Sequence, residues 1–338
     1  MTLAWPAVIE NLLVMSVGIA DTAMVGLLGA AYLAGVELAN RLVNLGVAIF
    51  AAVLIGTTAL VARSTGANDK KTANEAMRQA LVLVFLIGVP LLFLGTLYAE
   101  QCVTFMMVMQ ESPDPAVIEA GTIYLRITIP FLLFALLMMT INSCLRGAGD
   151  TRTPMVITGV SNVINIVGNY ILIYGAGPIP AMGVAGAAWA TNIARLAGAI
   201  LVFRAVYGER GTLSLRFNER FRFDPEIVRR IVRVGIPAAV EQGLMRSAQL
   251  VYGMIVAGLD TVSIAAHAVA LTAESISFMP GAGFSLAATT LVGQSLGAGD
   301  PDRAEQSGYE SGKMATLVMS AMGILFFVFP RFFVGLFS

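Results

Sequence analysis

The sequence is poor in charged residues, in cysteine and in histidine. Asp, Glu, Lys and Arg make up 12% of its 338 residues, whereas soluble domains carry roughly 25%. Its two cysteines, Cys102 and Cys144, do not form a Cys-x-x-Cys pair, and there is one histidine. A disulfide framework and a metal centre built from several histidines are therefore disfavoured. Zinc-protease, P-loop and dinucleotide motifs are absent as well, so we expect neither an enzyme nor a bound cofactor.

The chain is instead rich in long apolar segments. Hydrophobic residues make up 57% of it, in recurrent runs of about 20 residues or more, each long enough to cross roughly 30 Å of hydrocarbon as a helix. The pattern predicts an all-α polytopic membrane protein. Residues 102–109 are apolar but too short to span, and we expect them at the interface. Nine spans are predicted, at residues 3–28, 33–62, 79–99, 117–143, 155–174, 182–207, 227–258, 262–297 and 309–336.

Three prolines, Pro90, Pro130 and Pro280, fall inside predicted spans. Proline frees a backbone carbonyl of the preceding turn, but within a bundle a neighbouring helix can donate a hydrogen bond to it. We therefore expect these helices to be kinked and not broken.

Lysine and arginine are distributed unevenly between the loops. They concentrate after the second, fourth, sixth and eighth spans, with eight arginines between residues 204 and 233. The loop after the third span is acidic instead. Because positively charged loops remain cytoplasmic, we expect a cytoplasmic amino terminus and a protein of the inner (plasma) membrane.

An internal repeat organises the chain. When the sequence is shifted by 231 residues, Pro-Ala-Val-Ile-Glu at 6–10 aligns without a gap with Pro-Ala-Ala-Val-Glu at 237–241. Six spans separate the copies, so both have the same orientation, as in transporters whose two lobes are related by an axis along the membrane normal. Farther along, identical residues recur at 58, 60, 61, 64, 66, 67, 69 and 73 and at 289, 291, 292, 295, 297, 298, 300 and 304.

The two copies differ in length. A first lobe, residues 1–207, holds six predicted spans, and a cytoplasmic loop, residues 208–226, joins it to a second lobe, residues 227–338, that holds three. A second lobe equal to the first would need three more helices. We therefore expect nine of twelve helices, in a chain truncated at its carboxyl end.

Polar side chains inside the spans mark candidate sites, because charged and amide groups are costly at this depth. Asp21 lies in the outer half of the first span, and its own helix offers no basic partner. Asn165 and Asn169 lie four residues apart in the fifth span, and Thr191 lies in the sixth. Their oxygens suit a hard cation such as Na⁺, and a buried carboxylate suits a proton. For the amides and the hydroxyl, interhelical hydrogen bonding alone is the alternative.

A second set of intramembrane polar residues could line a cavity or contact a substrate. Two of them are spaced to form an ion pair on one helix face, which is the structural alternative for that pair. Glu10 and its repeat partner Glu241 lie near cytoplasmic helix ends, and their symmetry favours a structural or gate role. The candidate cavity residues are Glu37 and Arg41, which form that possible pair, together with Asn40 and Glu274.

Several segments of the chain resemble the multidrug and toxic compound extrusion (MATE) transporters, in particular the prokaryotic, DNA-damage-inducible type. Each segment alone is a weak signal, but together they cover the whole chain. They are Asp-Thr-Ala-Met-Val-Gly at 21–26, Gly-Ala-Asn-Asp at 66–69, Leu-Arg-Gly-Ala-Gly-Asp-Thr-Arg-Thr-Pro at 145–154, residues 165–169, Gly-Val-Ala-Gly-Ala-Ala-Trp-Ala-Thr at 183–191, and Gly-Gln-Ser-Leu-Gly-Ala-Gly-Asp at 293–300.

The resemblance implies twelve helices in two lobes, and export of organic, often cationic, compounds in exchange for Na⁺ or H⁺. It places the coupling ion at Asp21, Asn165, Asn169 and Thr191, with no metal beyond a possible Na⁺ at Asp21. One position departs from the archaeal pattern of the family, in which Asn169 is an aspartate, and this weakens a proton scheme based on two acids.

Several alternatives remain open at this stage. One is a flippase for lipid-linked precursors of the same superfamily, for which a strongly cationic cavity is expected, and another is an inactive transporter fragment. An intramembrane aspartyl protease is disfavoured, because the Gly-x-Gly-Asp motifs at 147–150 and 297–300 fall in predicted loops. The expected partners are small organic substrates and the lipid bilayer, not nucleic acid, and we expect a monomer.

Overall fold

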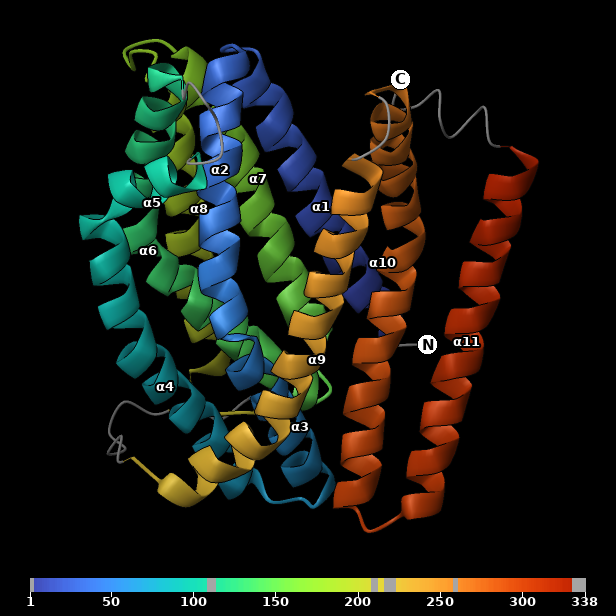
Figure 1. Cartoon of the computed structure of the whole chain (residues 1–338). Coiled ribbons are helices and arrows are strands. Elements are labelled where there is room, and N and C mark those ends of the chain that lie inside the picture. The colour runs from blue at the N-terminus through green and yellow to red at the C-terminus, as the bar shows by residue number, and fades with distance from the viewer. Residues whose placement is uncertain (1–2, 108–113, 208–211, 216–222, 258–260, 330–338) are drawn as a thin grey trace.

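The computed structural model describes residues 3–107, 114–207, 212–215, 223–257 and 261–329, except for the side chains of residues 250, 257, 261–266, 268–270 and 272–277. Within these ranges the regular structure is helical, with two isolated β-bridges, which confirms the predicted fold class. The helices (Figure 1) are α1 (Ala4–Gly26), α2 (Ala30–Ile49), α3 (Ala51–Gly66), α4 (Lys70–Leu97), α5 (Ala99–Met106), α6 (Pro115–Gly147), α7 (Arg152–Tyr174), α8 (Gly183–Val206), α9 (Pro225–Ala257), α10 (Thr261–Gly297) and α11 (Pro301–Val328).

The helices follow the predicted spans in order, and the short α5 overlaps the predicted interfacial segment. Six of them, α1, α4, α6, α7, α8 and α11, are long and apolar enough to cross a membrane, and the pair of α2 and α3 is a seventh candidate. Helices α9 and α10 coincide with two further predicted spans but do not meet that criterion over their described residues. The predicted number of nine is therefore approximate.

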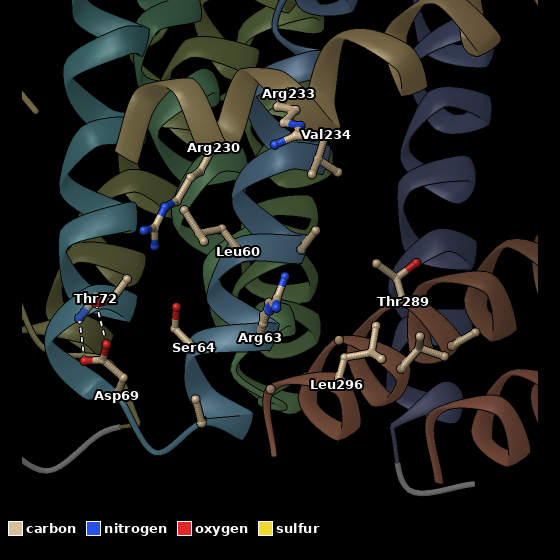
Figure 2. Close-up of a pocket in the computed structure, with 16 residues that line it drawn as sticks. Leu60, Arg63, Ser64, Asp69, Thr72, Arg230, Arg233, Val234, Thr289 and Leu296 are labelled. Carbon is tan, nitrogen blue, oxygen red and sulfur yellow. Dashed lines mark hydrogen bonds between the residues drawn. The ribbon is translucent and has the colours of Figure 1, made fainter. Parts of the chain in front are cut away.

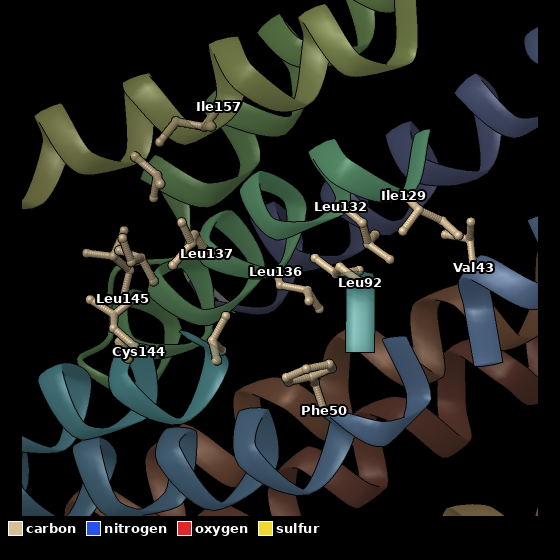
Figure 3. Close-up of a cluster of buried hydrophobic side chains, with 14 of the residues drawn as sticks. Val43, Phe50, Leu92, Ile129, Leu132, Leu136, Leu137, Cys144, Leu145 and Ile157 are labelled. Carbon is tan, nitrogen blue, oxygen red and sulfur yellow. The ribbon is translucent and has the colours of Figure 1, made fainter. Parts of the chain in front are cut away.

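The second predicted span is bent, a feature that the sequence analysis does not anticipate. Helices α2 and α3 meet at Phe50 with an angle of 43° between them, although neither helix contains a proline. Phe50 is 1% exposed, and Figure 3 shows its ring in the hydrophobic core. A Cβ atom placed on Gly88 of α4 would lie 3.6 Å from this ring. The bend thus coincides with burial of an aromatic side chain against a neighbouring glycine.

Helix α6 forms the centre of the first lobe. It is 33 residues long, and α2, α3, α4, α5 and α8 all pack against it. Leu132, Leu136 and Leu137 of α6 belong to one buried cluster with Phe50 and Leu92 (Figure 3). The middle of this helix, residues 129–139, is apolar without exception, as burial in a bundle requires.

Helix α6 continues through Pro130, as predicted. Two side chains of α8 donate hydrogen bonds to carbonyls of the preceding turn: Asn192 Nδ2 to Ile127 O at 2.7 Å, and Arg195 Nη1 to Thr128 O at 3.2 Å. A neighbouring helix thus supplies donors at the proline turn, which is how such helices are tolerated in membranes.

The two copies of the repeat share backbone geometry as well as sequence. Asn68 and its repeat partner Gly299 both have a positive φ, 59° and 76°, a conformation that favours Gly and Asn. The next residues, Asp69 and Asp300, cap α4 and α11 by accepting a hydrogen bond from the N–H three residues later, at 3.0 and 2.9 Å. The same helix–turn–cap unit therefore occurs in both lobes.

These turns lie at the end of the molecule where α3, α6, α8 and α10 finish and α4, α7, α9 and α11 begin, the lower end in Figure 1. We call it the basic end, because Arg63, Lys70, Lys71, Arg152 and Arg303 lie at these helix ends. The first lobe also holds residues 212–215 here: Ser214 N donates to Asn74 Oδ1 at 2.9 Å, and Leu215 is buried.

The lobes meet at the basic end through glycines. A Cβ atom on Gly66 would overlap the carbonyl oxygen of Gln294, and one on Gly297 would overlap that of Arg63. Gly66 is the repeat partner of Gly297, and Arg63 is the repeat partner of Gln294. The crossing of α3 and α10 is therefore symmetric, because each copy makes the contact that the other makes.

One pair of repeat partners meets at the centre of this crossing. A Cβ atom built on Gly293 would lie 2.7 Å from the Cβ atom of Ala62, which precedes it by 231 positions. A residue contacts its own symmetry equivalent only near a twofold axis. The axis inferred from the sequence repeat therefore passes between α3 and α10.

Candidate functional site

A cavity of about 450 Å³ lies within the first lobe, bordered by α1, α2, α6 and α8. Asp21 reaches it from the last two turns of α1, and Thr191 and Arg195 reach it from α8. Its lining is mixed in polarity. The polar side chains that border it are Asp21, Thr22, Glu37, Asn40, Asn44, Tyr124, Thr191 and Arg195.

The four residues predicted to bind a coupling ion form one continuous hydrogen-bonded chain. Thr191 Oγ1 donates to the carbonyl oxygen of Ala187 at 2.9 Å and accepts from Asn165 Nδ2 at 3.4 Å. Asn169 Nδ2 donates to Asn165 Oδ1 at 3.2 Å and to Asp21 Oδ1 at 2.5 Å. Residues from α1, α7 and α8 are thereby brought together. Their roles remain predictions, but their proximity is a property of the fold.

The chain of hydrogen bonds leaves one buried acceptor unused. Asn169 is 1% exposed, and its Oδ1 atom has no hydrogen-bond partner among the described residues. Asp21 beside it is half-buried, with one carboxylate oxygen engaged by Asn169. Buried acceptors in native proteins are normally satisfied, and a cation is one species that could complete this group.

Helix α2 contributes two of its three predicted residues to the first-lobe cavity. Glu37 and Asn40 border the cavity, but Arg41 does not. Arg41 borders a separate pocket of about 300 Å³ that Glu37 also touches. Glu37 Oε1 accepts a hydrogen bond from Thr22 Oγ1 at 3.2 Å, and the ion pairs of the described chain do not include one between Glu37 and Arg41. The possible ion pair is therefore not formed, because the carboxylate turns toward α1.

Glu274 of α10, the remaining candidate, lies outside the described side chains. Four polar residues of the cavity are absent from the predicted set: Thr22, Asn44, Tyr124 and Arg195. Tyr124 of α6 is buried at 4% exposure, and a tyrosine in an apolar run carries no signal that separates it from the core. Arg195 follows Thr191 by four residues on one helix, so the helical spacing could have identified it. Arg195 makes no ion pair within 4 Å in the described part of the chain.

Glu10 is buried and contacts two other helices, which fits the structural role that its position in the repeat suggests. It is 8% exposed, and its Oε1 lies 3.0 Å from Arg146 Nη1 and 3.4 Å from Thr158 Oγ1. The ion pair joins α1 to the end of α6. A residue held in this way fixes helix positions and is not available to a substrate.

The Gly-x-Gly-Asp motifs also have a structural explanation. Asp150, the residue before the N-cap Thr151 of α7, accepts a hydrogen bond from Thr153 N at 3.0 Å through its Oδ1, and Asp300, the N-cap of α11, accepts one from Arg303 N. Aspartates at N-caps satisfy free N–H groups at the start of a helix. Both motifs thus form helix-starting turns.

Comparison with known proteins agrees with this architecture. The MatE family model matches residues 6–171 and 237–338, and the two matches start 231 positions apart, which is the offset of the internal repeat. The chain belongs to the MATE family of membrane transporters, as the sequence resemblance predicts.

Similar proteins have a range of described activities. A probable multidrug resistance protein NorM of Thermotoga maritima is 30% identical, over 99% of this chain and 71% of the relative. A FAD transporter of Shewanella oneidensis is 26% identical, over 100% and 74%. A solved outward-facing conformation of a multidrug resistance MATE transporter superposes with a TM-score of 0.89 at 23% identity, over 99% of this chain and 73% of that one. The last similarity concerns the fold alone.

Proposed function

We propose that this protein is a secondary active antiporter that exports organic, cationic drugs or metabolites in exchange for Na⁺ or H⁺. One observation carries the proposal: Asp21 borders a first-lobe cavity of about 450 Å³ and ends a hydrogen-bonded chain through Asn169, Asn165 and Thr191. An ionisable carboxylate inside a membrane span is costly, and such residues mark ion and substrate pathways in transporters.

In this mechanism Asp21 is the binding site for the coupling ion. Ion binding neutralises its carboxylate and weakens it as the acceptor of the hydrogen bond that Asn169 Nδ2 donates. Because the hydrogen-bonded residues come from α1, α7 and α8, a change at Asp21 alters the packing of these three helices. The ion can shift the conformational equilibrium only by its difference in affinity between the two states.

Contacts between the lobes favour an outward-open conformation. They join α3 to α9 and α10, and Val8 in the first half of α1 to Gly283 of α10. Asp21 lies beyond these contacts, toward the other end of α1. With the basic end in the cytoplasm, as the loop charges predict, the first-lobe cavity would open to the outside.

The remaining features of the proposal follow the sequence analysis. The protein is a monomer of the inner (plasma) membrane with a cytoplasmic amino terminus, it works without a cofactor or nucleic acid, and it is not an enzyme. The first lobe comprises residues 1–207 and the second begins at residue 227. A flippase for lipid-linked precursors, for which a strongly cationic cavity is expected, is less well supported, because the cavity presents Asp21 and Glu37 as well as Arg195.

The test is ethidium efflux from cells or proteoliposomes, measured separately under a Na⁺ gradient and a proton gradient. Asp21→Asn is expected to abolish efflux under the productive gradient while the protein is still expressed. Glu100→Gln is the matched control, because this exposed acid pairs with Arg126 away from the cavity. Undiminished efflux by Asp21→Asn would exclude the coupling role.

A further inference from the structure

The arginines of this chain differ in their depth along the helices. Around a cavity of about 1300 Å³ at the basic end, Arg63 lies in the last turn of α3, and Arg230 and Arg233 lie in the first turns of α9 (Figure 2). The predicted cytoplasmic location of that end accounts for them. Arg195 is different, because it lies near the middle of α8 and borders the first-lobe cavity. A cation at this depth in a span is costly and marks a functional site.

The guanidinium of Arg195 has more donors than its contacts use. It carries five N–H groups, and in the described chain one of them is used, from Nη1 to Thr128 O at 3.2 Å. Arg195 makes no ion pair within 4 Å among the described residues. The contact with Thr128 belongs to the proline turn of α6, which Asn192 also supports. Because Arg195 borders the cavity, its other donors are available to a bound molecule.

Hydrogen bonds between helices fix the depth of Arg195 relative to Asp21. Asp21 is bonded to Asn169, whereas Thr191 is bonded to Asn165, which lies four residues nearer the basic end on α7. Arg195 follows Thr191 by a further four residues toward that end. Since a helix rises about 1.5 Å per residue, the Cα atom of Arg195 lies roughly 12 Å deeper than that of Asp21.

Acidic groups occupy the opposite part of the cavity. The carboxylate of Glu37 lies beside the residue that follows Asp21, because Thr22 Oγ1 donates to Glu37 Oε1 at 3.2 Å. Val36 and Val43 of α2 contribute apolar surface to the same cavity. The cavity therefore has two carboxylates toward its outer part and a guanidinium toward the basic end.

We propose that Arg195 determines substrate specificity by binding a carboxylate of the exported compound, so that the cavity prefers molecules with both a cationic and an acidic group to simple cations. This rests on the proposed function and names the class of compound exported. The cationic group of the substrate lies toward Asp21 and Glu37, and its carboxylate accepts hydrogen bonds from Arg195.

The chemistry and size of the cavity suit such a compound. A guanidinium offers paired N–H groups that match the two oxygens of a carboxylate. A single guanidinium that shares its cavity with Asp21 and Glu37 suits one negative charge better than the two of a phosphate monoester. The volume of about 450 Å³ falls within the range of about 300–1,000 Å³ that is typical of small-molecule sites. All residues that border this cavity lie between positions 14 and 195.

Direct binding to the 338-residue chain in phosphatidylcholine nanodiscs tests the proposal, with empty nanodiscs as the blank. The probes are an unalkylated rhodamine in its free-acid form and its methyl ester, two dyes that share a cationic xanthene ring and differ in one carboxylate. Fluorescence anisotropy gives a dissociation constant for each dye without an ion gradient. We expect the protein to bind the acid about tenfold more tightly than the ester, as a hydrogen bond between charged groups predicts.

Substitutions at the proline turn separate recognition from structural support. Arg195→Gln keeps a donor for Thr128 O but removes the charge. It should weaken binding of the acid about tenfold and tighten binding of the ester, since repulsion between two cations is lost. Arg195→Lys keeps the charge and should retain part of the preference for the acid. Asn192→Leu is the matched control, because it removes the other donor to this turn from outside the cavity, and the ratio of the two dissociation constants should not change.

Three outcomes would overturn the proposal: no preference for the acid in the unsubstituted protein, equal weakening of both dyes by Arg195→Gln, or loss of the preference in Asn192→Leu. Equal weakening would give Arg195 a structural role alone. The efflux test of Asp21→Asn is independent of these measurements. If that variant exports ethidium undiminished while the preference for the acid persists, the coupling role of Asp21 is excluded and the role of Arg195 is upheld.

Discussion

Adding one methyl group at the centre of the crossing between the lobes should force them apart. A Cβ atom on Gly293 would lie 2.7 Å from the Cβ atom of Ala62, whereas carbon atoms in contact stay about 3.5–4.0 Å apart. Gly293→Ala therefore requires a separation of roughly 1 Å between α3 and α10. Overpacking of this kind typically costs about 1–3 kcal/mol, which corresponds to a 5–150-fold shift in an equilibrium.

The separation can be measured by pulsed electron spin resonance between labels at Ala67 and Ala298, two exposed repeat partners at the ends of α3 and α10. Gly293→Ala should lengthen or broaden the distance distribution and lower the melting temperature. Gly312→Ala is the control, because a Cβ atom there meets nothing within 4 Å.

The double variant Ala62→Gly with Gly293→Ala exchanges the two residues across the axis. It should recover most of the original distance distribution, since only one Cβ atom then stands at the crossing. An unchanged distribution and melting temperature in Gly293→Ala would refute the assignment of the twofold axis to this contact.

Three further predictions concern stability. Arg146→Met leaves the buried Glu10 without its ion-pair partner and should cost about 3–5 kcal/mol; the melting temperature should fall, and adding Glu10→Gln should restore part of it. Asn192→Leu removes the donor to the carbonyl of Ile127 and should cost about 1 kcal/mol, with efflux retained because Asn192 does not line the first-lobe cavity. Asp69→Ala should speed hydrogen exchange at the start of α4. Hydrogen bonds from the side chain and N–H of Thr72 lower the pKa of Asp69 below its ordinary 3.8. The Asp69 cap is therefore intact above pH 3.8 and is lost as the pH falls through the lower pKa. Between about pH 5 and 8, hydrogen exchange at the start of α4 should not depend on the titration of Asp69.

The pattern of apolar runs was sufficient to predict the helices, because a helix in lipid must satisfy its own backbone and needs a minimum length. The bend at Phe50 could not be predicted in this way. It depends on the space beside Gly88, a residue of another helix. Arg41 was assigned to the cavity as a polar residue inside a predicted span, with an ion pair to Glu37 as the structural alternative. In the structure Thr22 of α1 engages the Glu37 carboxylate, and Arg41 borders a separate pocket.

Sequence alone determined the repeat, its offset of 231 residues and the set of intramembrane polar residues, since these depend on residue order and on the cost of burying polar groups. Only the tertiary structure decided which of those residues meet. It joined Asp21 to Asn169 across two helices and added Arg195 and Tyr124 to the same cavity. Contacts between distant segments depend on how helices pack against one another, and hydrophobic patterning within a single helix does not specify that packing.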